Sequence, residues 1–330
     1  MLQHTLIRDM QASQLVEGVY AIQNCQLAQT KNGKPYLKCL LADRSGRTPA
    51  RMWNMSEDVF RSLPTDGFVW VEGQTQPYQG QMQIIVGQIR SIEPSEVELR
   101  ELLPSSPHDS EQMFDELVGI LNTLVDPSLK ALTRAYLDDT ELMAQFKQAP
   151  AATTLHHAYL GGLLEHTLSL LRLAGVFCPL YPLVNRDVVL VGLFVHDLGK
   201  CSELAWKEGF HYTDEGQLVG HIARGVVWLQ QKADLCAAQG NPISPAVLCV
   251  LQHIVLSHHG LPEHGALKIP STPEAIAVSL LDNLDAKLNM AVAATRAESA
   301  KVGGMGGNFT EKIWALETRM YWPDPTQVDD

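Results

Sequence analysis

The stretch VVLVGLFVHDLGK, residues 188–200, decides how the second half of the chain folds. Eight apolar or small residues at 188–195 predict a buried helix, and the polar pair His196-Asp197 follows directly. Gly199 then ends the predicted helix. A buried polar side chain without a partner costs several kcal/mol, so this pair requires partners elsewhere in the fold.

Other apolar helical segments carry histidine or aspartate in the same way. A single buried histidine is usually a hydrogen-bonded core residue, but several helices that each direct one inward are better explained by a shared metal site. Neutral imidazoles and carboxylates are good ligands for divalent transition metals. The candidate ligands are His166, His196, Asp197, His221, one of the neighbours His258 and His259, and Asp282, with Asp285 one turn further along the same predicted helix.

The adjacency of His196 and Asp197 limits how they bind metal. Neighbouring helical side chains point about 100° apart, so the two contact two sides of one ion, or the aspartate bridges two ions. Two ions about 3.5–4 Å apart suit phosphoester hydrolysis, because they activate water and hold phosphate oxygens. The cluster therefore predicts a metal-dependent phosphohydrolase.

The first part of the chain predicts a small β-barrel. Asn32-Gly33 separates the apolar runs at 19–30 and 35–43, which is a strong hairpin signal. Further runs at 47–54, 66–78 and 81–93 bring the predicted strands to about five. A short helix is predicted at 57–63, before the fourth strand. This layout favours an OB-fold, and another small barrel such as an SH3-like one is the alternative.

The predicted fold class is α+β, with a change of pattern near residue 96. Charge, proline and serine at 96–112 indicate a connection, and apolar spacing of three and four residues then predicts helices. The expected organisation is an OB-fold at 1–95, a linker and helical segment at 96–150, an all-helical domain at 151–318 and a disordered tail at 319–330.

The composition is that of an ordinary globular protein, with 45% hydrophobic and 19% charged residues. The net charge of −12 is uneven, because residues 1–95 hold nine basic and eight acidic residues. No apolar run approaches the roughly 20 residues of a membrane-spanning helix, and the N-terminus lacks the pattern of a secretory signal. The six cysteines include no C-x-x-C pair, which argues against a zinc ribbon. A cytoplasmic protein without a membrane partner is expected.

Basic and aromatic residues alternate along the predicted barrel. Lys34, Tyr36 and Trp53 are candidates for binding a single nucleic-acid strand, by pairing with phosphates and stacking on bases. Aromatic residues in strands more often belong to the core, which is the interpretation favoured for Trp70 in FVWVEG. The near-neutral charge of residues 1–95 is compatible with nucleic acid as a partner.

The order of histidines and aspartates resembles that of the HD-domain phosphohydrolase superfamily, namely His166, His196-Asp197, His221, His258 or His259, and Asp282. The resemblance implies that Asp197 bridges two ions and that Lys200 lies near the substrate phosphate. It favours Asp282 over Asp285, because the pattern places the ligand three residues before a second aspartate. His258 is preferred to His259 as the ligand.

Most of the chain, from about residue 19 to 289, is similar to the YhaM-type 3′-5′ exoribonucleases, which join an OB-fold to an HD domain. The likeness is carried by NGKPYLKCLLADRSG, HHAYLGGLLEHTLSL, HDLGK, GHIARG, LSHHG and LLDNLDAKL. It implies hydrolysis of single-stranded RNA, and sometimes DNA, from the 3′ end to nucleoside monophosphates. Two divalent ions are implied, with Mn²⁺ favoured and Fe, Co²⁺, Ni²⁺ or Mg²⁺ as alternatives.

Several assignments stay open at this point. Arg224, one helical turn after His221, binds a phosphate or forms a surface ion pair, and His259 is a further substrate-binding candidate. His156 and His157 contact substrate or cap a helix. Two other functions are kept, a phosphohydrolase of small or cyclic nucleotides and a non-catalytic RNA-binding adaptor. Assembly into a homo-oligomer is also left open.

Overall fold

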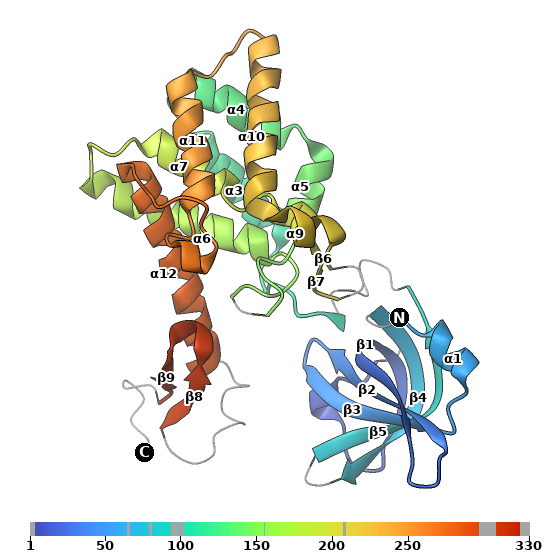
Figure 1. Cartoon of the computed structure of the whole chain (residues 1–330). Helices are drawn as coiled ribbons and strands as arrows, with labels where there is room; N and C mark the ends of the chain where they lie inside the picture. Colours follow the sequence, from blue (N-terminus) through green and yellow to red (C-terminus); the bar gives the residue numbers. More distant parts are fainter. Residues whose placement is uncertain are drawn as a thin grey trace. The chain divides into compact units, whose positions relative to one another are not determined.

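The computed structural model describes residues 4–64, 67–78, 81–93, 99, 102–154, 156–206, 209–296 and 308–323. The chain divides into two compact units, residues 1–107 with 205–211, and residues 108–204 with 212–330. The first is built on a β-barrel and the second is largely helical (Figure 1). The division falls after Pro107, further along the chain than residue 95.

The first unit is a closed five-stranded barrel. Its strand order is β1-β2-β3-β5-β4, in which β3 and β5 run parallel and the other neighbours run antiparallel. This is the Greek-key barrel of an OB-fold, which confirms the preferred prediction. Its elements are η1 (Ile7–Asp9), β1 (Leu15–Gln29), β2 (Pro35–Asp43), β3 (Gly46–Trp53), α1 (Glu57–Ser62), β4 (Gly67–Tyr78) and β5 (Gln81–Ser91).

Alternation along the strands fills the barrel. On β2, Leu37, Cys39 and Leu41 are buried while Lys38 is exposed. Trp70 on β4 is only half-buried, so the expectation that it belongs to the core was wrong. The reason is register: its neighbours in sequence point inward, and Trp70 faces outward beside Arg90, whose guanidinium lies 4.9 Å from the ring centre.

The second unit packs its helices around α7. That helix contacts α4, α6, α11 and α12, and nine of its ten residues are buried. Figure 1 shows α10 and α11 side by side, with α12 descending below α6. The main helices are α3 (Ser110–Leu121), α4 (Pro127–Leu137), α5 (Thr140–Phe146), α6 (Gly162–Phe177), α7 (Arg186–Val195), α10 (Gly220–Ala238), α11 (Pro245–Ser257) and α12 (Pro273–Thr295).

Capping residues explain where most of these helices begin. The side chains of Asp109, Asp126 and Asp139 accept hydrogen bonds from backbone N–H groups at the starts of α3, α4 and α5. Asn185 and Thr272 do the same for α7 and α12. Short elements fill the connections, namely η2 (Cys178–Leu180), α8 (Lys200–Glu203), α9 (Asp214–Leu218), η3 (Pro262–His264) and η5 (Trp314–Leu316).

The structure corrects the predicted organisation at three places. Leu99, Leu102 and Leu103 of the expected linker are buried, because this segment carries apolar side chains among its charges. The predicted all-helical domain contains two small hairpins. The expected disordered tail begins with a strand, because residues 318–321 pair with a preceding strand; residues 324–330 lie outside the described part. The hairpins are β6 (Leu204–Ala205) with β7 (His211–Tyr212), and β8 (Phe309–Ile313) with β9 (Thr318–Tyr321).

The apolar stretch that contains α6 is also longer than the sequence analysis expected. Together with the turn after it, α6 forms a segment, Gly162–Leu180, that is long and apolar enough to cross a membrane by length and composition alone. Half of the apolar window is buried inside the unit, and His166 on it is completely buried. This apolar character fits a central helix, which buries much of its circumference.

Candidate metal centre

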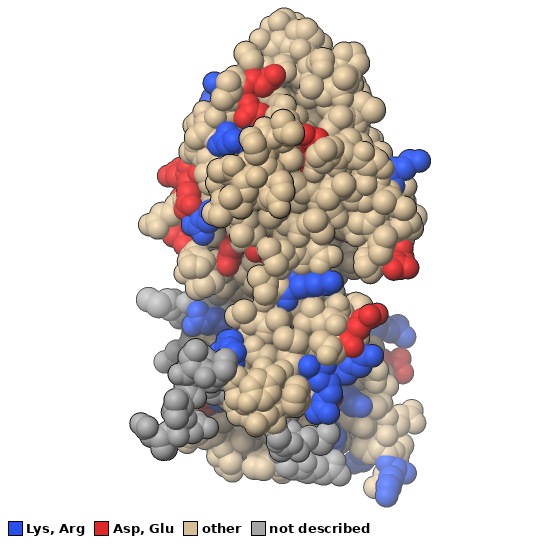
Figure 2. Space-filling model, turned by 90° about the vertical axis from the view of Figure 1, so that its left-hand side faces the viewer, with Lys and Arg blue, Asp and Glu red and all other residues tan. Residues whose placement is uncertain are grey.

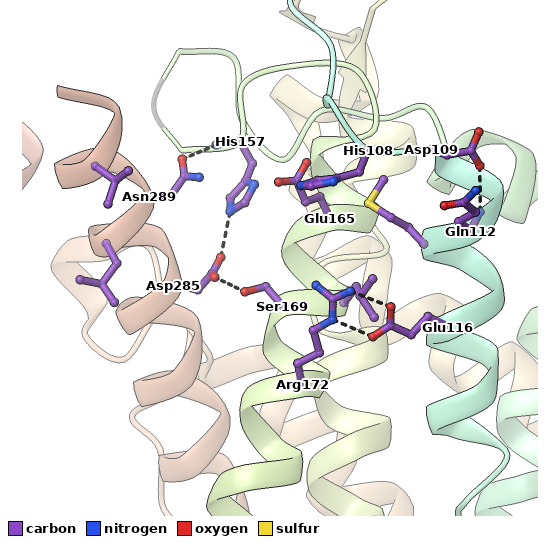
Figure 3. A pocket seen from close by; sticks show the side chains of 14 residues that line it. His108, Asp109, Gln112, Glu116, His157, Glu165, Ser169, Arg172, Asp285 and Asn289 are labelled. Atoms are coloured by element: carbon purple, nitrogen blue, oxygen red, sulfur yellow. Dashed lines mark hydrogen bonds and ion pairs between the residues drawn. The ribbon is translucent and has the colours of Figure 1, made fainter. Parts of the chain in front are cut away.

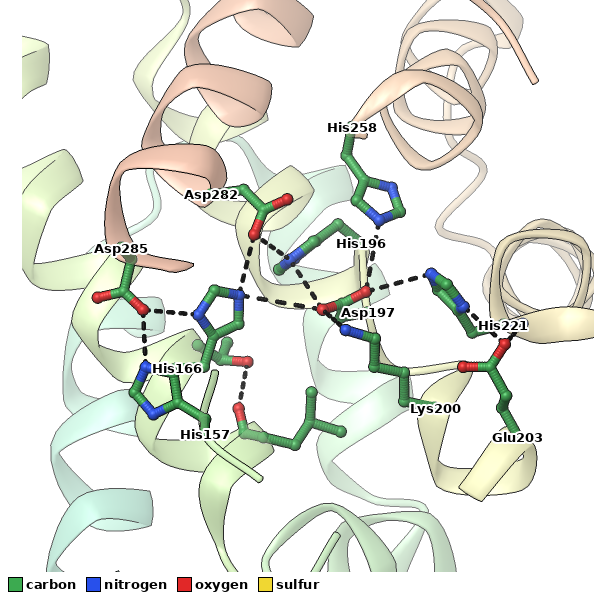
Figure 4. Close-up of polar contacts among 12 residues, drawn as sticks. His157, His166, His196, Asp197, Lys200, Glu203, His221, His258, Asp282 and Asp285 are labelled. Atoms are coloured by element: carbon green, nitrogen blue, oxygen red, sulfur yellow. Dashed lines mark hydrogen bonds and ion pairs between the residues drawn. The ribbon is translucent and has the colours of Figure 1, made fainter. Parts of the chain in front are cut away.

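The predicted ligands converge in the helical unit from five helices (Figure 4). They come from the second turn of α6, the turn that follows α7, the first turn of α10, the residue after α11 and the middle of α12. Their side chains are almost completely withdrawn from solvent, the most accessible retaining 14% exposure. The residues are His166, His196, Asp197, His221, His258 and Asp282.

The carboxylate of Asp197 divides the cluster into two halves. On its Oδ2 side, the Nε2 atoms of His166 and His196 lie 3.9 Å and 3.4 Å away, and Asp282 Oδ1 lies 3.2 Å from His166 Nε2. On its Oδ1 side, the Nε2 atoms of His221 and His258 lie 3.5 Å and 3.4 Å away. Each oxygen of one carboxylate therefore faces its own set of imidazoles, an arrangement suited to two ions.

The facing atoms lack hydrogen-bond partners. Among the residues that the structure describes, Nε2 of His166, His196, His221 and His258 is buried without one, and so is Asp197 Oδ1. Each such group carries a desolvation cost of about 1–3 kcal/mol. Several of them at one place are therefore expected to have a common binding partner. Four imidazole nitrogens and carboxylate oxygens fit divalent transition metals, so the residues present suit the predicted ions.

A second layer of contacts orients the imidazoles. Nδ1 of His196 and His258 lies 2.8 Å from the carbonyl oxygens of Leu193 and Val255, to which only an N–H group donates. Nδ1 of His221 similarly donates to Glu203 Oε1 at 2.9 Å. Because Nδ1 holds the hydrogen, the Nε2 lone pair is directed at the cluster, as in metal sites of proteins.

Asp285 belongs to this second layer. Its Oδ2 accepts hydrogen bonds from His166 Nδ1 at 2.7 Å and His157 Nε2 at 2.9 Å, and its Oδ1 accepts one from Ser169. Asp282, by contrast, lies on the Nε2 side of His166. The geometry thus separates two aspartates that spacing alone left equivalent, and supports Asp282 as the ligand.

Gly199 brings the HDLGK turn close to α10. Its backbone is helical, and α7 already ends at Val195, so Gly199 does not end that helix as predicted. A Cβ atom at Gly199 would lie 2.1 Å from the carbonyl oxygen of His221. Glycine is needed here for space, because it lets the turn that carries Asp197 approach the helix that carries His221.

Charge in the cluster is strongly coupled. Burial acts to raise the pKa of Asp197, but Lys200 and His196 outweigh it and hold that pKa well below its usual range. Lys200 is buried, and its Nζ donates to Asp197 Oδ2 at 2.7 Å. Burial acts to lower the pKa of His166, yet Asp282 and Asp285 raise it to about 9.

Two histidines given smaller roles by the sequence also lie at the cluster. A ring nitrogen of His259 lies within 4.8 Å of the ligand atoms of Asp197, His221 and His258. His156 lies 5.9 Å from His166 between ring centres, and burial with nearby Lys200 lowers the pKa of His156 to about 4. Both have a buried Nδ1 without a hydrogen-bond partner. The signal in the sequence that points to both residues is that each stands beside another histidine, in His156-His157 and His258-His259.

The remaining candidates are Arg224 of the helical unit and three residues of the barrel. Arg224 forms an ion pair with Glu215 on α9, which agrees with the ion pair expected as the alternative to phosphate binding. On the barrel, Tyr36 and Trp53 are cross-strand neighbours with ring centres 5.0 Å apart, and Trp53 is 44% exposed. Lys34 is exposed in the adjoining hairpin. Arg51 on β3 belongs to the same basic and aromatic series, and its guanidinium lies 5.1 Å from the Tyr78 ring centre.

The barrel, the helical unit and its cluster define an HD-domain protein fused to an OB-fold, and the HD domain family model matches residues 163–287. The chain is 37% identical to "3'-5' exoribonuclease YhaM" of Geobacillus sp. (strain WCH70) over 88% of this chain and 86% of that one. It is 35% identical to the Bacillus subtilis (strain 168) protein of the same name, over 88% and 89%. The chain belongs to the YhaM exoribonuclease family.

Among solved structures, the chain is similar to an OB-fold domain. The second OB-fold domain of replication protein A from Methanococcus maripaludis covers 28% of this chain and 98% of that one, with 17% identity and a TM-score of 0.24. At that score it carries no functional argument, and the OB-fold assignment rests on the strand order of the barrel.

Proposed function

We propose that this protein is a metal-dependent 3′-5′ exoribonuclease that hydrolyses single-stranded RNA to nucleoside monophosphates. The observation that carries the chemistry is the unpartnered Nε2 cluster on both sides of Asp197. Membership of the YhaM family supports the RNA substrate and the direction. A cytoplasmic location belongs to the same proposal and rests on the sequence.

The proposed ligands are His166, His196 and Asp282 on one side of Asp197, and His221 and His258 on the other, with His259 as a further candidate. Bound divalent ions supply Lewis-acid charge that activates water and neutralises phosphate oxygens. Mn²⁺ is the proposed metal. Asp197 faces both sets of imidazoles and so fixes their spacing.

Two side chains are proposed to act on the substrate itself. Lys200 keeps a positive charge at the cluster, because Asp197 raises its pKa although burial acts to lower it. That charge favours a phosphate. His156 brings a buried Nδ1 without a partner among the described residues to the same region, suited to a hydrogen bond with a phosphate or ribose oxygen.

The barrel is proposed to hold the single strand. Tyr36 and Trp53 offer adjacent ring surfaces on β2 and β3, and Lys38 lies opposite Arg51 on the same pair of strands. Stacked aromatics beside basic side chains bind strands with little sequence preference. Lys34 adds a charge in the adjoining hairpin. Single-stranded DNA is a second substrate to be tested.

The test is a digestion of 5′-labelled single-stranded RNA with Mn²⁺, followed on a denaturing gel. We expect a ladder that shortens from the 3′ end, nucleoside monophosphates as products, and complete inhibition by EDTA. Asp197→Asn protein purified in parallel controls for contaminating nuclease. Intact RNA, with turnover of a small or cyclic nucleotide instead, would replace this proposal with the small-nucleotide function.

A further inference from the structure

A hollow of about 560 Å³ lies on the wall of the barrel, over β3, β5 and β4. Its size falls within the range of ligand pockets in proteins, about 300–1,000 Å³. Trp53, at the end of β3, borders the hollow and is 44% exposed. Because β3 lies between β2 and β5, Tyr36 is on the β2 side of Trp53 and the hollow extends over its β5 side. The aromatic surface of the barrel therefore continues into an unfilled space.

Two glycines open this hollow, at a bulge between β4 and β5. Glu72 pairs with Gln88 and Gly73 pairs with Val86, so Gly87 is an extra residue in β5 that no residue of β4 opposes. Gly73 and Gly87 both line the hollow. The wall of the barrel is bare here because neither residue has a side chain.

The two glycines differ in what the fold requires of them. A Cβ atom at Gly73 would lie 2.6 Å from the carbonyl oxygen of Ile85, so the crossing of the strands needs a glycine. At Gly87 the nearest atom to a Cβ would be the carbonyl oxygen of Glu72 at 3.6 Å, an ordinary contact, and the backbone there is not left-handed. Glycine weakens a strand, and in a strand it often marks the close approach of a ligand. The space over Gly87 therefore needs an explanation outside the fold.

The lining of the hollow suits an uncharged, polar ligand. Glu72 is the charged residue among the described lining residues, and Gln74 and Gln76 contribute amides. Gln74 Nε2 donates to the carbonyl oxygen of Ser13 at 3.2 Å, and Gln76 Oε1 accepts from Gln83 Nε2 at 3.2 Å. Because an amide carries both donors and acceptors, these bonds leave each side chain able to bond the edge of a ligand. A phosphate, by contrast, is repelled by the carboxylate.

Basic side chains lie next to the hollow on the neighbouring strands. Lys38 on β2 is opposite Arg51 on β3, and Arg51 is opposite Ile85, which lines the hollow. Proteins that bind single strands combine a basic path for the backbone with aromatic side chains for the bases. A strand that follows Lys38 and Arg51 with its phosphates can turn a base toward Trp53 and the hollow.

The helical unit presents a different kind of surface. On its visible face, Figure 2 shows Lys and Arg scattered among Asp and Glu rather than gathered in a stripe. Its hollow of about 420 Å³ between α3, α6 and α12 includes charges that pair with one another (Figure 3), since Arg172 is bonded to Glu116 and His157 to Asp285. The hollow on the barrel instead offers an exposed ring and amides.

We propose that the hollow on the barrel binds one unpaired nucleobase of the RNA, packed against Trp53 over Gly87 and hydrogen-bonded at its edge by Gln74 and Gln76. This inference rests on the proposed function, because it assigns a base site to the strand that the barrel is proposed to hold. The missing side chain at Gly87 lets a flat ring approach the backbone. Glu72 keeps the phosphates on the side of the basic residues.

Filling the hollow tests the proposal. Affinity of the full-length protein for a fluorescent single-stranded RNA is measured by anisotropy in EDTA, which leaves the RNA uncleaved. Gly87→Val is expected to weaken binding about 10-fold, as loss of one base contact should. Its melting temperature should not fall, because valine suits a strand better than glycine. Ser91→Val, at an exposed position of β5 outside the hollow, should bind like wild type. Equal affinity of Gly87→Val and wild type overturns the proposal.

Two further measurements keep the test independent of how Gly87→Val folds. Gly87→Ala adds a single methyl group for which there is room, and it is expected to weaken binding about 3-fold. An abasic ribose–phosphate strand of the same length should bind wild type and both variants equally. Equal losses on the abasic strand would identify a phosphate site and contradict the base site. Digestion is measured separately with Mn²⁺, so absent hydrolysis removes the proposed exoribonuclease, whereas equal binding by the Gly87 variants and wild type removes the base site.

Discussion

Each unit of this protein buries an aspartate, and the two aspartates have opposite surroundings. In the barrel, Asp43 accepts hydrogen bonds from the backbone N–H groups of Ile7, Ser45 and Gly46 and from the side chains of Ser45 and His4. In the helical unit, Oδ2 of Asp197 accepts a hydrogen bond from Lys200, and its Oδ1 accepts none from the described residues. Both side chains are nearly inaccessible to solvent.

The difference separates a structural charge from a functional one. The donors around Asp43 come from its own turn and from the segment before β1, so the carboxylate joins two parts of the barrel. The imidazoles around Asp197 direct lone pairs at it, which is unfavourable until positive charge is bound between them. Burial alone therefore does not mark a functional carboxylate, whereas a buried carboxylate oxygen that no donor faces does.

The largest expected effect is at Asp197. Asp197→Asn keeps the size of the side chain and an acceptor for Lys200 but removes the charge shared by the two halves of the cluster. We expect RNA hydrolysis to fall on the order of 10³-fold or more, with a metal-free melting temperature close to that of wild type. Steady-state kinetics with Mn²⁺ and calorimetry measure both. Near-normal turnover would refute the metal-centre assignment.

At Asp43 we expect the opposite result, a loss of stability with little change in activity. Burial acts to raise its pKa, but hydrogen bonds from His4, Ser45 and the Ile7 N–H hold it below its usual range. Asp43→Asn should lower the stability of the barrel by about 3 kcal/mol, because donors are left facing an amide. A lowered folded-state pKa gives stability that is present above the unfolded-state pKa and lost as pH falls through the folded one.

Calorimetry of full-length wild type and Asp43→Asn from pH 7 down to pH 3 measures this contribution. The difference between the two proteins should shrink as the pH falls. RNA cleavage per folded molecule should change little at pH 7, in contrast to Asp197→Asn. A constant difference across the pH range would show that the charge of Asp43 is not the source of its effect.

A smaller effect is expected at Asp285. Asp285→Asn weakens the support of His166 without removing a proposed ligand, so metal affinity or activity should fall about 10–100-fold. Excess Mn²⁺ should restore most of the maximal rate, which it cannot do for Asp197→Asn. Titration of activity against Mn²⁺ is the measurement. A loss that no metal concentration reverses would place Asp285 among the ligands.

The smallest effect is expected on the barrel surface. Trp53→Ala should weaken binding of single-stranded RNA by about 1–3 kcal/mol, the value of one base stacked on an aromatic ring. Hydrolysis of a small phosphodiester that contacts only the metal centre should be unchanged. Val59→Ala, an exposed apolar site on α1, is the control. Equal binding by all three proteins would exclude Trp53 from the RNA surface.

Much of the fold could be predicted because the relevant patterns are local. Alternation and the Asn32-Gly33 turn predicted the strands, and spacing of three and four residues predicted the helices. The outward orientation of Trp70 was missed, since its run of sequence is apolar and only the pairing with Arg90 reveals the face. The β8–β9 hairpin was missed because its strands are short and exposed.

The sequence by itself determined which residue types meet at the centre, because buried histidines and aspartates on separate apolar helices need a common partner. Tertiary structure alone decided how they meet. It placed two imidazoles at each oxygen of Asp197 and set Asp285 behind His166. The physical reason is that periodicity is a property of one segment, whereas the side of a carboxylate that an imidazole faces depends on how separate helices pack.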